Sequence, residues 1–176
     1  RFAQDEQIAT GEIKEIIELA RLSASSANLQ PLKYMFSNTA EKNKLIFPYL
    51  AWAGYLKDWG GPQEGERPTA YIIILGDTEI KKECDCDAGI AAQNMVLGLT
   101  EKGYGGCMVS AIAREKLRGA LNIPVRYDII MVIAFGKSRE TVVLETVGKD
   151  GNIRYWRDKD GTHHVPKRTL GDIIIE

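Results

Sequence analysis

The chain of 176 residues has few of the side chains that most often bind metals or activate nucleophiles, because it contains two histidines and three cysteines. The histidines, His163 and His164, are adjacent, and adjacent side chains of an extended segment point to opposite faces, so they are poor joint ligands. Neither a Ser/His/Asp set nor a histidine-rich metal set can be assembled around them. The shortage argues against hydrolytic and zinc chemistry and fits an enzyme in which a cofactor carries the chemistry.

The cysteines are an odd number in a chain large enough to have its own core, which argues against a disulfide scaffold and for a reducing cytoplasm. Cys84 and Cys86 stand in a Cys-x-Cys pattern, whereas structural metal sites use Cys-x-x-Cys with a second ligand pair, so we expect no metal site. We interpret the cysteines as packing residues. Asp85 and Asp87 fit a helix start, where carboxylates favour the dipole, and that position can lower the pKa of the Cys84 thiol.

Long hydrophobic runs and blocks of like charge are also missing. The longest apolar runs, at residues 70–75 and 129–135, are too short to span a bilayer, so we expect buried strands there and no membrane partner. A net charge of −1 without a continuous Lys/Arg block provides no general field for nucleic acid, so any anion site must be local. No signal peptide is visible, and because the chain opens at Arg1 rather than Met, we expect further residues upstream.

The composition, 44% hydrophobic and 27% charged, is that of a globular protein with a substantial core. No repeat or linker interrupts it, so we expect residues 1–176 to form one α+β domain. Apolar spacing predicts helices over residues 5–24, 85–102 and 114–121, and a short helix capped by Asn38 or Thr39. Strands are predicted over residues 33–37, 70–76, 104–110 and 127–136, with tail hairpins around Asp150-Gly151 and Asp160-Gly161.

Two motifs stand between these elements. The polar stretch Ser25-Ser26-Ala27-Asn28-Leu29-Gln30-Pro31 separates the first helix from the first strand, and local bonds from Ser and Asn to the backbone are its ordinary explanation. Gly103-Tyr104-Gly105-Gly106-Cys107 follows a helix and enters a strand, the reverse of a phosphate-binding turn, which excludes a Rossmann or P-loop site. Its glycines form a helix C-cap and tight turn, or they let bare backbone approach a flat ring.

With the basic pair Lys167-Arg168 near the end and Arg1-Phe2 at the start, these motifs resemble the FMN-dependent nitroreductase family. The resemblance follows nearly the whole chain in order. It implies a nitroreductase-like fold, with a mixed, mainly antiparallel sheet flanked by helices, and an intertwined homodimer with two FMN sites at the interface.

The resemblance also implies the residues that bind the flavin ring. A Ser-x-x-Asn-x-Gln-Pro-like signature of the family, whose Ser and Asn contact the flavin of the neighbouring subunit, is matched by Ser25, Ser26, Asn28, Gln30 and Pro31. The family segment that makes main-chain contacts with the N5/O4 edge of the ring is matched by Val109, Ser110 and Ala111.

The phosphate of FMN needs cationic donors, and the family supplies them from both ends of the chain. The matching positions are Arg1, Lys167 and Arg168, for which solvated terminal charge is the alternative. We expect the apolar residues 173–175 to anchor the tail that carries the basic pair.

Five aromatic residues lie between Phe47 and Trp59, ahead of a segment rich in glycine and proline that can act as a lid. Core packing is the usual role of such side chains. In the family this region borders the active site, so Trp52, Tyr55 and Trp59 are also candidates to contact substrate.

The reaction that the resemblance implies is ping-pong: NAD(P)H reduces the flavin at N5, and a nitroaromatic, quinone or similar small acceptor then takes the electrons in the same pocket. No catalytic side chain is required. Two alternatives stay open, a specialised flavin enzyme such as a reductive dehalogenase or a flavin-fragmenting enzyme, and a non-catalytic flavin-binding module.

Overall fold

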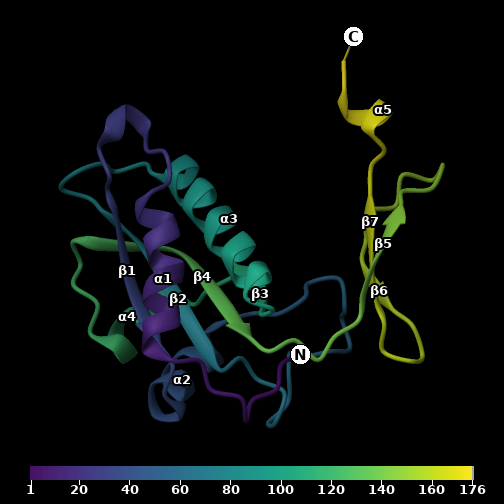
Figure 1. Ribbon diagram of the computed structural model, residues 1–176, viewed down its shortest axis with the longest axis horizontal. Coiled ribbons are helices and arrows are strands. Elements are labelled where there is room, and N and C mark those ends of the chain that lie inside the picture. Colours follow the sequence, from purple (N-terminus) through teal and green to yellow (C-terminus); the bar gives the residue numbers. More distant parts are fainter. Residues whose placement is uncertain (176) are drawn as a thin grey trace. The chain divides into compact units, whose positions relative to one another are not determined.

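The computed structural model describes residues 1–175, which form two compact units (Figure 1). Unit 1 consists of residues 1–51 and 62–138, and unit 2 consists of residues 52–61 and the described residues from Arg139 onward. The single domain expected over residues 1–176 stays a prediction.

Unit 1 is built on a four-stranded sheet in the order β1-β2-β4-β3, in which all neighbouring strands are antiparallel. The strands are β1 (Leu32–Ser37), β2 (Ala70–Asp77), β3 (Gly105–Val109) and β4 (Tyr127–Gly136). All of β2 is buried, because it lies inside the sheet and has both faces covered. The predicted strands are confirmed, and β1 and β3 form the two edges of the sheet.

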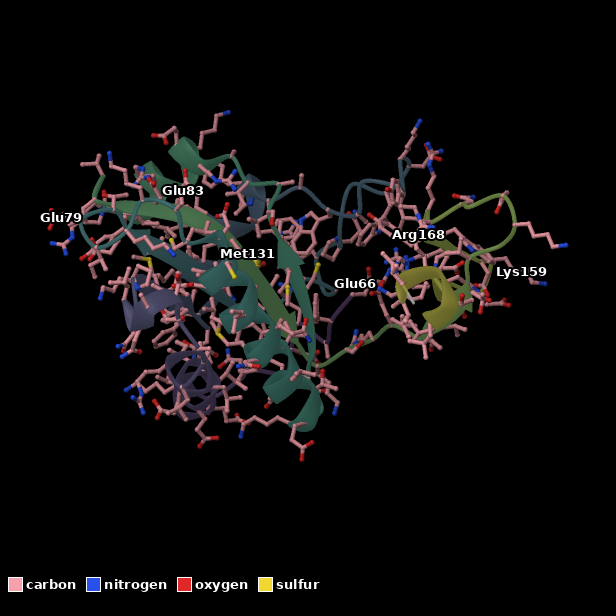
Figure 2. All side chains as sticks on the ribbon, turned by 90° about the horizontal axis from the view of Figure 1, so that it is seen from above. Glu66, Glu79, Glu83, Met131, Lys159 and Arg168 are labelled. Atoms are coloured by element: carbon pink, nitrogen blue, oxygen red, sulfur yellow. The ribbon has the colours of Figure 1, made fainter. Side chains whose placement is uncertain are left out.

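Two helices of unit 1, α1 (Thr10–Arg21) and α3 (Asp85–Glu101), lie side by side against the sheet (Figure 1). The core that they form with the sheet contains side chains from both helices and both inner strands: Ile13, Ile16, Met95, Leu99, Ile72, Ile74, Ile133 and Phe135. The partly buried Met131 of β4 packs against this core and lies at the centre of unit 1 (Figure 2).

The boundaries of the helices follow from local hydrogen bonds. Helix α1 starts later than the predicted residue 5, because Ala9 caps it and donates its N–H to Glu12 Oε2 at 3.3 Å. Of the two predicted caps for α2 (Ala40–Ile46), Thr39 is the one used, since its hydroxyl accepts the Lys42 N–H at 3.4 Å. A short 3₁₀ turn, η2 (Phe47–Tyr49), follows α2.

Helix α3 ends as predicted, with Gly103 at a φ of +76° just beyond its C-cap. The last helix of unit 1, α4 (Arg114–Leu121), has its predicted bounds and packs against α2. The α+β fold with a mainly antiparallel sheet flanked by helices is therefore confirmed.

Unit 2 contains a three-stranded sheet in the order β5-β7-β6 and the short helix α5 (Leu170–Ile173). Its strands are β5 (Val142–Thr146), β6 (Trp156–Arg157) and β7 (His163–Lys167). The hairpin at Asp160-Gly161 is confirmed, because β6 and β7 pair antiparallel and Gly161 has a φ of +83°. The hairpin at Asp150-Gly151 was wrong: a turn forms there, but β5 pairs in parallel with β7, which occupies the central position.

The two adjacent histidines of β7 have different environments, as an extended strand requires. The His164 ring stacks on Trp156, with centroids 3.9 Å apart, and its Nδ1 lies 2.7 Å from Glu145 Oε1. The hydrogen bond to Glu145 raises the pKa of His164 against an opposing effect of burial, and Asp158 raises it further. Burial lowers the pKa of His163.

We expect unit 2 to lose stability as the pH rises through the pKa of His164. Because the folded pKa is raised above the unfolded value of about 6.5, the contribution of His164 is complete below that pH and disappears above the folded value. All three tryptophans belong to unit 2, so their fluorescence during denaturation reports on it. A His164→Asn variant should lose this decline in stability above about pH 6.5, and an unchanged decline would contradict the assignment.

Candidate functional site

The polar loop at residues 25–31 connects α1 to β1 and has an unusual backbone. Its 3₁₀ turn, η1 (Ser26–Asn28), leads through Leu29 to Gln30. Three of its residues have positive φ although none is glycine: 49° at Ala27, 55° at Asn28 and 51° at Gln30. Such angles are uncommon for residues with a Cβ and are concentrated at functional sites, where surrounding contacts impose them.

Asp87, in the first turn of α3, binds this loop directly. Its carboxylate accepts the Ser25 hydroxyl at 2.8 Å and the Ser26 N–H at 3.1 Å, and the Ser25 hydroxyl in turn accepts the Gln30 N–H at 3.0 Å. Sequence reasoning assigned Asp87 to the helix dipole alone and missed this contact. The available signal was its spacing, because Asp87 lies four residues before the buried Ala91 and so faces the core.

Within the loop, the side chains differ in what they can offer a ligand. The Gln30 amide is used internally, since its Nε2 donates to Asn28 O at 3.1 Å and to Asn28 Oδ1 at 3.2 Å. Ser25 is partly buried and bound to Asp87, whereas Ser26 and Asn28 are exposed. Ser26 and Asn28 are therefore the side chains of this loop best placed to meet a ligand.

The second predicted contact segment, residues 109–111, begins at the last residue of β3. Val109 is buried, so it can offer only its backbone, while Ser110 and Ala111 are exposed. Their carbonyl groups accept hydrogen bonds from Arg114 Nη2 at 3.3 Å and from the Ala51 N–H at 2.9 Å. The segment is thus held rigidly from within unit 1.

The glycines before this segment have close neighbours. A Cβ at Gly106 would lie 3.2 Å from Leu99 Cδ1 of α3, and a Cβ at Gly105 would lie 3.0 Å from Ser138 Cβ. These close contacts favour glycine at both positions, and the approach of their bare backbone to a flat ring stays a prediction.

A single chain does not bring the two predicted ring-binding motifs to one place. The 25–31 loop leads into β1, and residues 109–111 begin at the last residue of β3. These two strands are the opposite edges of the sheet. Two strands lie between them, which corresponds to a separation of roughly 14 Å at about 4.8 Å per strand.

The predicted phosphate-binding cations are divided between the units. Arg1 belongs to unit 1, where its Nε lies 3.4 Å from Glu66 Oε2. Lys167 and Arg168 are exposed in unit 2, and Arg168 is labelled in Figure 2. The grouping of the three around one anion stays a prediction.

The tail that carries the basic pair is anchored differently from the prediction. The tail is held through β7, where Lys167 pairs with Thr146 of β5. The carbonyl oxygen of Lys167 also accepts the Val147 N–H at 2.9 Å. The apolar residues expected to anchor it are 61%, 56% and 99% exposed at Ile173, Ile174 and Ile175, so that expectation was wrong for the single chain.

The three aromatic candidates for substrate contact belong to unit 2. Two of them pack within it: Arg157 covers the Trp59 ring at 4.2 Å, and a Cβ at Gly61 would lie 2.6 Å from Trp52 Cδ1. Tyr55 is 46% exposed, and its ring centroid lies 4.8 Å from that of Tyr155. A substrate-side role for Trp52, Tyr55 and Trp59 stays a prediction.

Burial, strengthened by the neighbouring Asp85 and Asp87, raises the pKa of the Cys84 thiol, so the expected acidification of Cys84 was wrong. Residues 1–175 contain no group of three or more His, Cys, Asp or Glu side chains placed to hold a metal ion. None of the helices in the same range is long and apolar enough to cross a membrane.

Comparison with known proteins gives a family match that nearly coincides with unit 1. A family model described as the nitroreductase family matches residues 1–137. A curated relative from Archaeoglobus fulgidus, named as an NADH dehydrogenase/NAD(P)H nitroreductase, is 24% identical over 150 residues, which are 80% of each chain.

Solved structures share the fold. A nitroreductase family protein from Streptococcus pneumoniae TIGR4 has a TM-score of 0.70 at 18% identity and covers 99% of this chain and 92% of its own. A nitroreductase in complex with FMN from Exiguobacterium sibiricum 255-15 has a TM-score of 0.64 at 17% identity, with 79% and 82% of the chains covered.

Proposed function

The chain belongs to the nitroreductase family, and we propose that it is an FMN-dependent oxidoreductase that uses NAD(P)H to reduce nitroaromatic, quinone or similar electron-poor acceptors. Support comes from the family match over residues 1–137 and from the names of its relatives, one an NAD(P)H nitroreductase and another a nitroreductase in complex with FMN. The odd number of cysteines supports a reducing, cytoplasmic location.

One observation of the structure carries the proposal: a polar loop with a strained backbone occupies the position of the family's flavin-binding signature. Three non-glycine residues with positive φ present the exposed Ser26 and Asn28, and Asp87 fixes the loop from behind. A hydroxyl and a carboxamide are suitable hydrogen-bond partners for the carbonyl and N–H groups of a flavin ring. The residues present therefore fit FMN.

Each part of the chain has a separate task in this proposal. Bound FMN would supply hydride and electron transfer between NAD(P)H and the acceptor. Ser26 and Asn28 would hold the ring, and the backbone of residues 109–111 would meet its edge. Lys167, Arg168 and Arg1 would bind the phosphate as charge-assisted donors. No side chain of this set has to act as an acid or a base.

We propose that the active form is a homodimer. The two ring-binding motifs lie on opposite edges of one sheet, and in a two-fold dimer the loop of one protomer can complete the site of its partner. Sedimentation of the purified protein should therefore give twice 19.6 kDa. A monomer that binds FMN with full affinity would contradict the shared site.

The cofactor can be identified from the purified protein. We expect absorbance bands of an oxidised flavin, either on purification or after addition of FMN, and release of FMN rather than FAD on denaturation. A colourless protein that also fails to take up added FMN would refute the proposal.

A further inference from the structure

The carboxylate of Asp87 is buried under the loop that carries the flavin-binding signature. Asp87 is 2% exposed, and its two oxygens accept from the Ser25 hydroxyl and the Ser26 N–H. Since the Ser25 hydroxyl then accepts the Gln30 N–H, a single carboxylate connects both ends of the bend in the loop. The last residue of the loop, Pro31, is held by a further bond, because its carbonyl oxygen accepts the Asp77 N–H at 2.9 Å.

These contacts oppose the conformational strain of the loop. Each left-handed residue other than glycine is unfavourable, and three of them occur within four positions at Ala27, Asn28 and Gln30. A loop of this composition would relax to other conformations without restraints from outside. The restraint at Ser25 and Ser26 comes from the first turn of α3, a helix of 17 residues that is packed into the core.

The charge of Asp87 is retained despite its burial. Burial opposes ionisation of the carboxyl, but the hydrogen bonds from Ser26 and Ser25, with a contribution from the charge of Lys81, hold the pKa of Asp87 below its ordinary value. An ionised carboxylate accepts stronger hydrogen bonds than a neutral group, so it suits the restraint of a strained loop.

We propose that Asp87 is a positioning residue, which shapes the 25–31 loop from behind so that Ser26 and Asn28 meet the flavin ring. Ser25 transmits this effect and does not itself bind the ring, because its hydroxyl is engaged by Asp87 and Gln30. The inference rests on the proposed function and adds Asp87 to the residues on which flavin binding depends.

The test compares Asp87→Ala, Asp87→Asn and Ser25→Ala with the wild type by titration with FMN and with riboflavin. Asp85→Ala is the matched control, since Asp85 is an exposed carboxylate in the same first turn of α3. Hydrogen exchange of the amides at residues 26–30 gives a readout that needs no flavin. Circular dichroism and unfolding midpoints establish that each variant is folded.

We expect Asp87→Ala to weaken the affinity for FMN by about ten-fold or more. The affinity for riboflavin should fall equally, because the substitution affects contacts with the ring and not with the phosphate. Asp87→Asn should lie between this variant and the wild type, since an amide oxygen can still accept the Ser26 N–H. Asp85→Ala should stay within about two-fold, as expected for a surface change. Exchange at residues 26–30 should accelerate in Asp87→Ala and Ser25→Ala. A variant that carries both Ser25→Ala and Asp87→Ala should lose little more FMN affinity than Asp87→Ala alone, because Ser25 acts through Asp87.

A purely structural role of Asp87 would lower the unfolding midpoint but leave the flavin affinity and the exchange of the loop unchanged in the folded protein. That result would overturn the inference while the proposed function stands. If Asp87→Ala does not fold, the flavin affinity and the loop exchange of Ser25→Ala test the inference in its place. A wild-type protein that binds neither FMN nor riboflavin would overturn the proposed function, and the inference with it.

Discussion

Removal of the two cations near the C-terminus, by Lys167→Ala together with Arg168→Ala, should weaken FMN binding by about 3–6 kcal/mol, since each charge-assisted contact contributes about 1.5–3 kcal/mol. Riboflavin has the same ring without the phosphate, so its affinity should change little. The loss should be large because Lys167 ends strand β7 and is already ordered by its pairing with Thr146, so less conformational entropy opposes its contact with an anion.

Titration of both ligands against the wild type and the double variant measures this difference. Lys149→Ala with Lys159→Ala removes the same charge from two exposed positions of unit 2 and serves as the matched control (Figure 2 labels Lys159). Equal losses for FMN and riboflavin in the double variant at residues 167 and 168 would show that the tail does not bind the phosphate.

Truncation of Phe135 to alanine should lower the free energy of unfolding by about 3–5 kcal/mol, because it leaves a large cavity in a packed core. Phe135 is 0% exposed on β4, and it packs with α1 and α3 in the core of unit 1. Denaturant unfolding of the protein without added flavin measures the change. Val125→Ala is the control, since Val125 is 86% exposed and its truncation should cost less than about 0.5 kcal/mol.

A loss below about 1 kcal/mol for Phe135→Ala would show that the core of unit 1 is more loosely packed than the burial of Phe135 indicates. The same variant should leave unit 2 folded, because the core around Phe135 belongs to unit 1 alone. Tryptophan fluorescence, which reports on unit 2, separates the two effects.

The elements of unit 1 could be predicted from the sequence because each has a local signal. The apolar runs predicted β2 and β4, and the spacing of the alanines and Met95 predicted α3, with Gly103 just beyond its end. In unit 2, local signals failed for β5: the turn at Asp150-Gly151 forms, but the partner of β5 is the distant β7. Strand pairing depends on tertiary contacts, which a turn motif does not specify.

The candidate site was predictable only as far as its motifs extend. The polar composition of residues 25–31 drew attention to the loop, but its positive φ angles and the buried contact with Asp87 depend on a helix that lies far along the chain. The glycines at 105 and 106 lie close to Ser138 and α3, and the sequence motif did not reveal these contacts. A short polar motif therefore indicated a candidate site without revealing the contacts that shape its loop.

We propose that this chain passes electrons from a nicotinamide to an acceptor through bound FMN. Anaerobic mixing of the FMN-loaded protein with NADH or NADPH, followed by addition of a quinone or nitroaromatic, tests this electron transfer when the flavin absorbance is recorded throughout. We expect the oxidised flavin bands to bleach with at least one nicotinamide and to return when the acceptor is added. A protein that binds FMN but keeps its oxidised bands with both nicotinamides would be a flavin-binding module without turnover, and that result would rule out the proposed electron transfer.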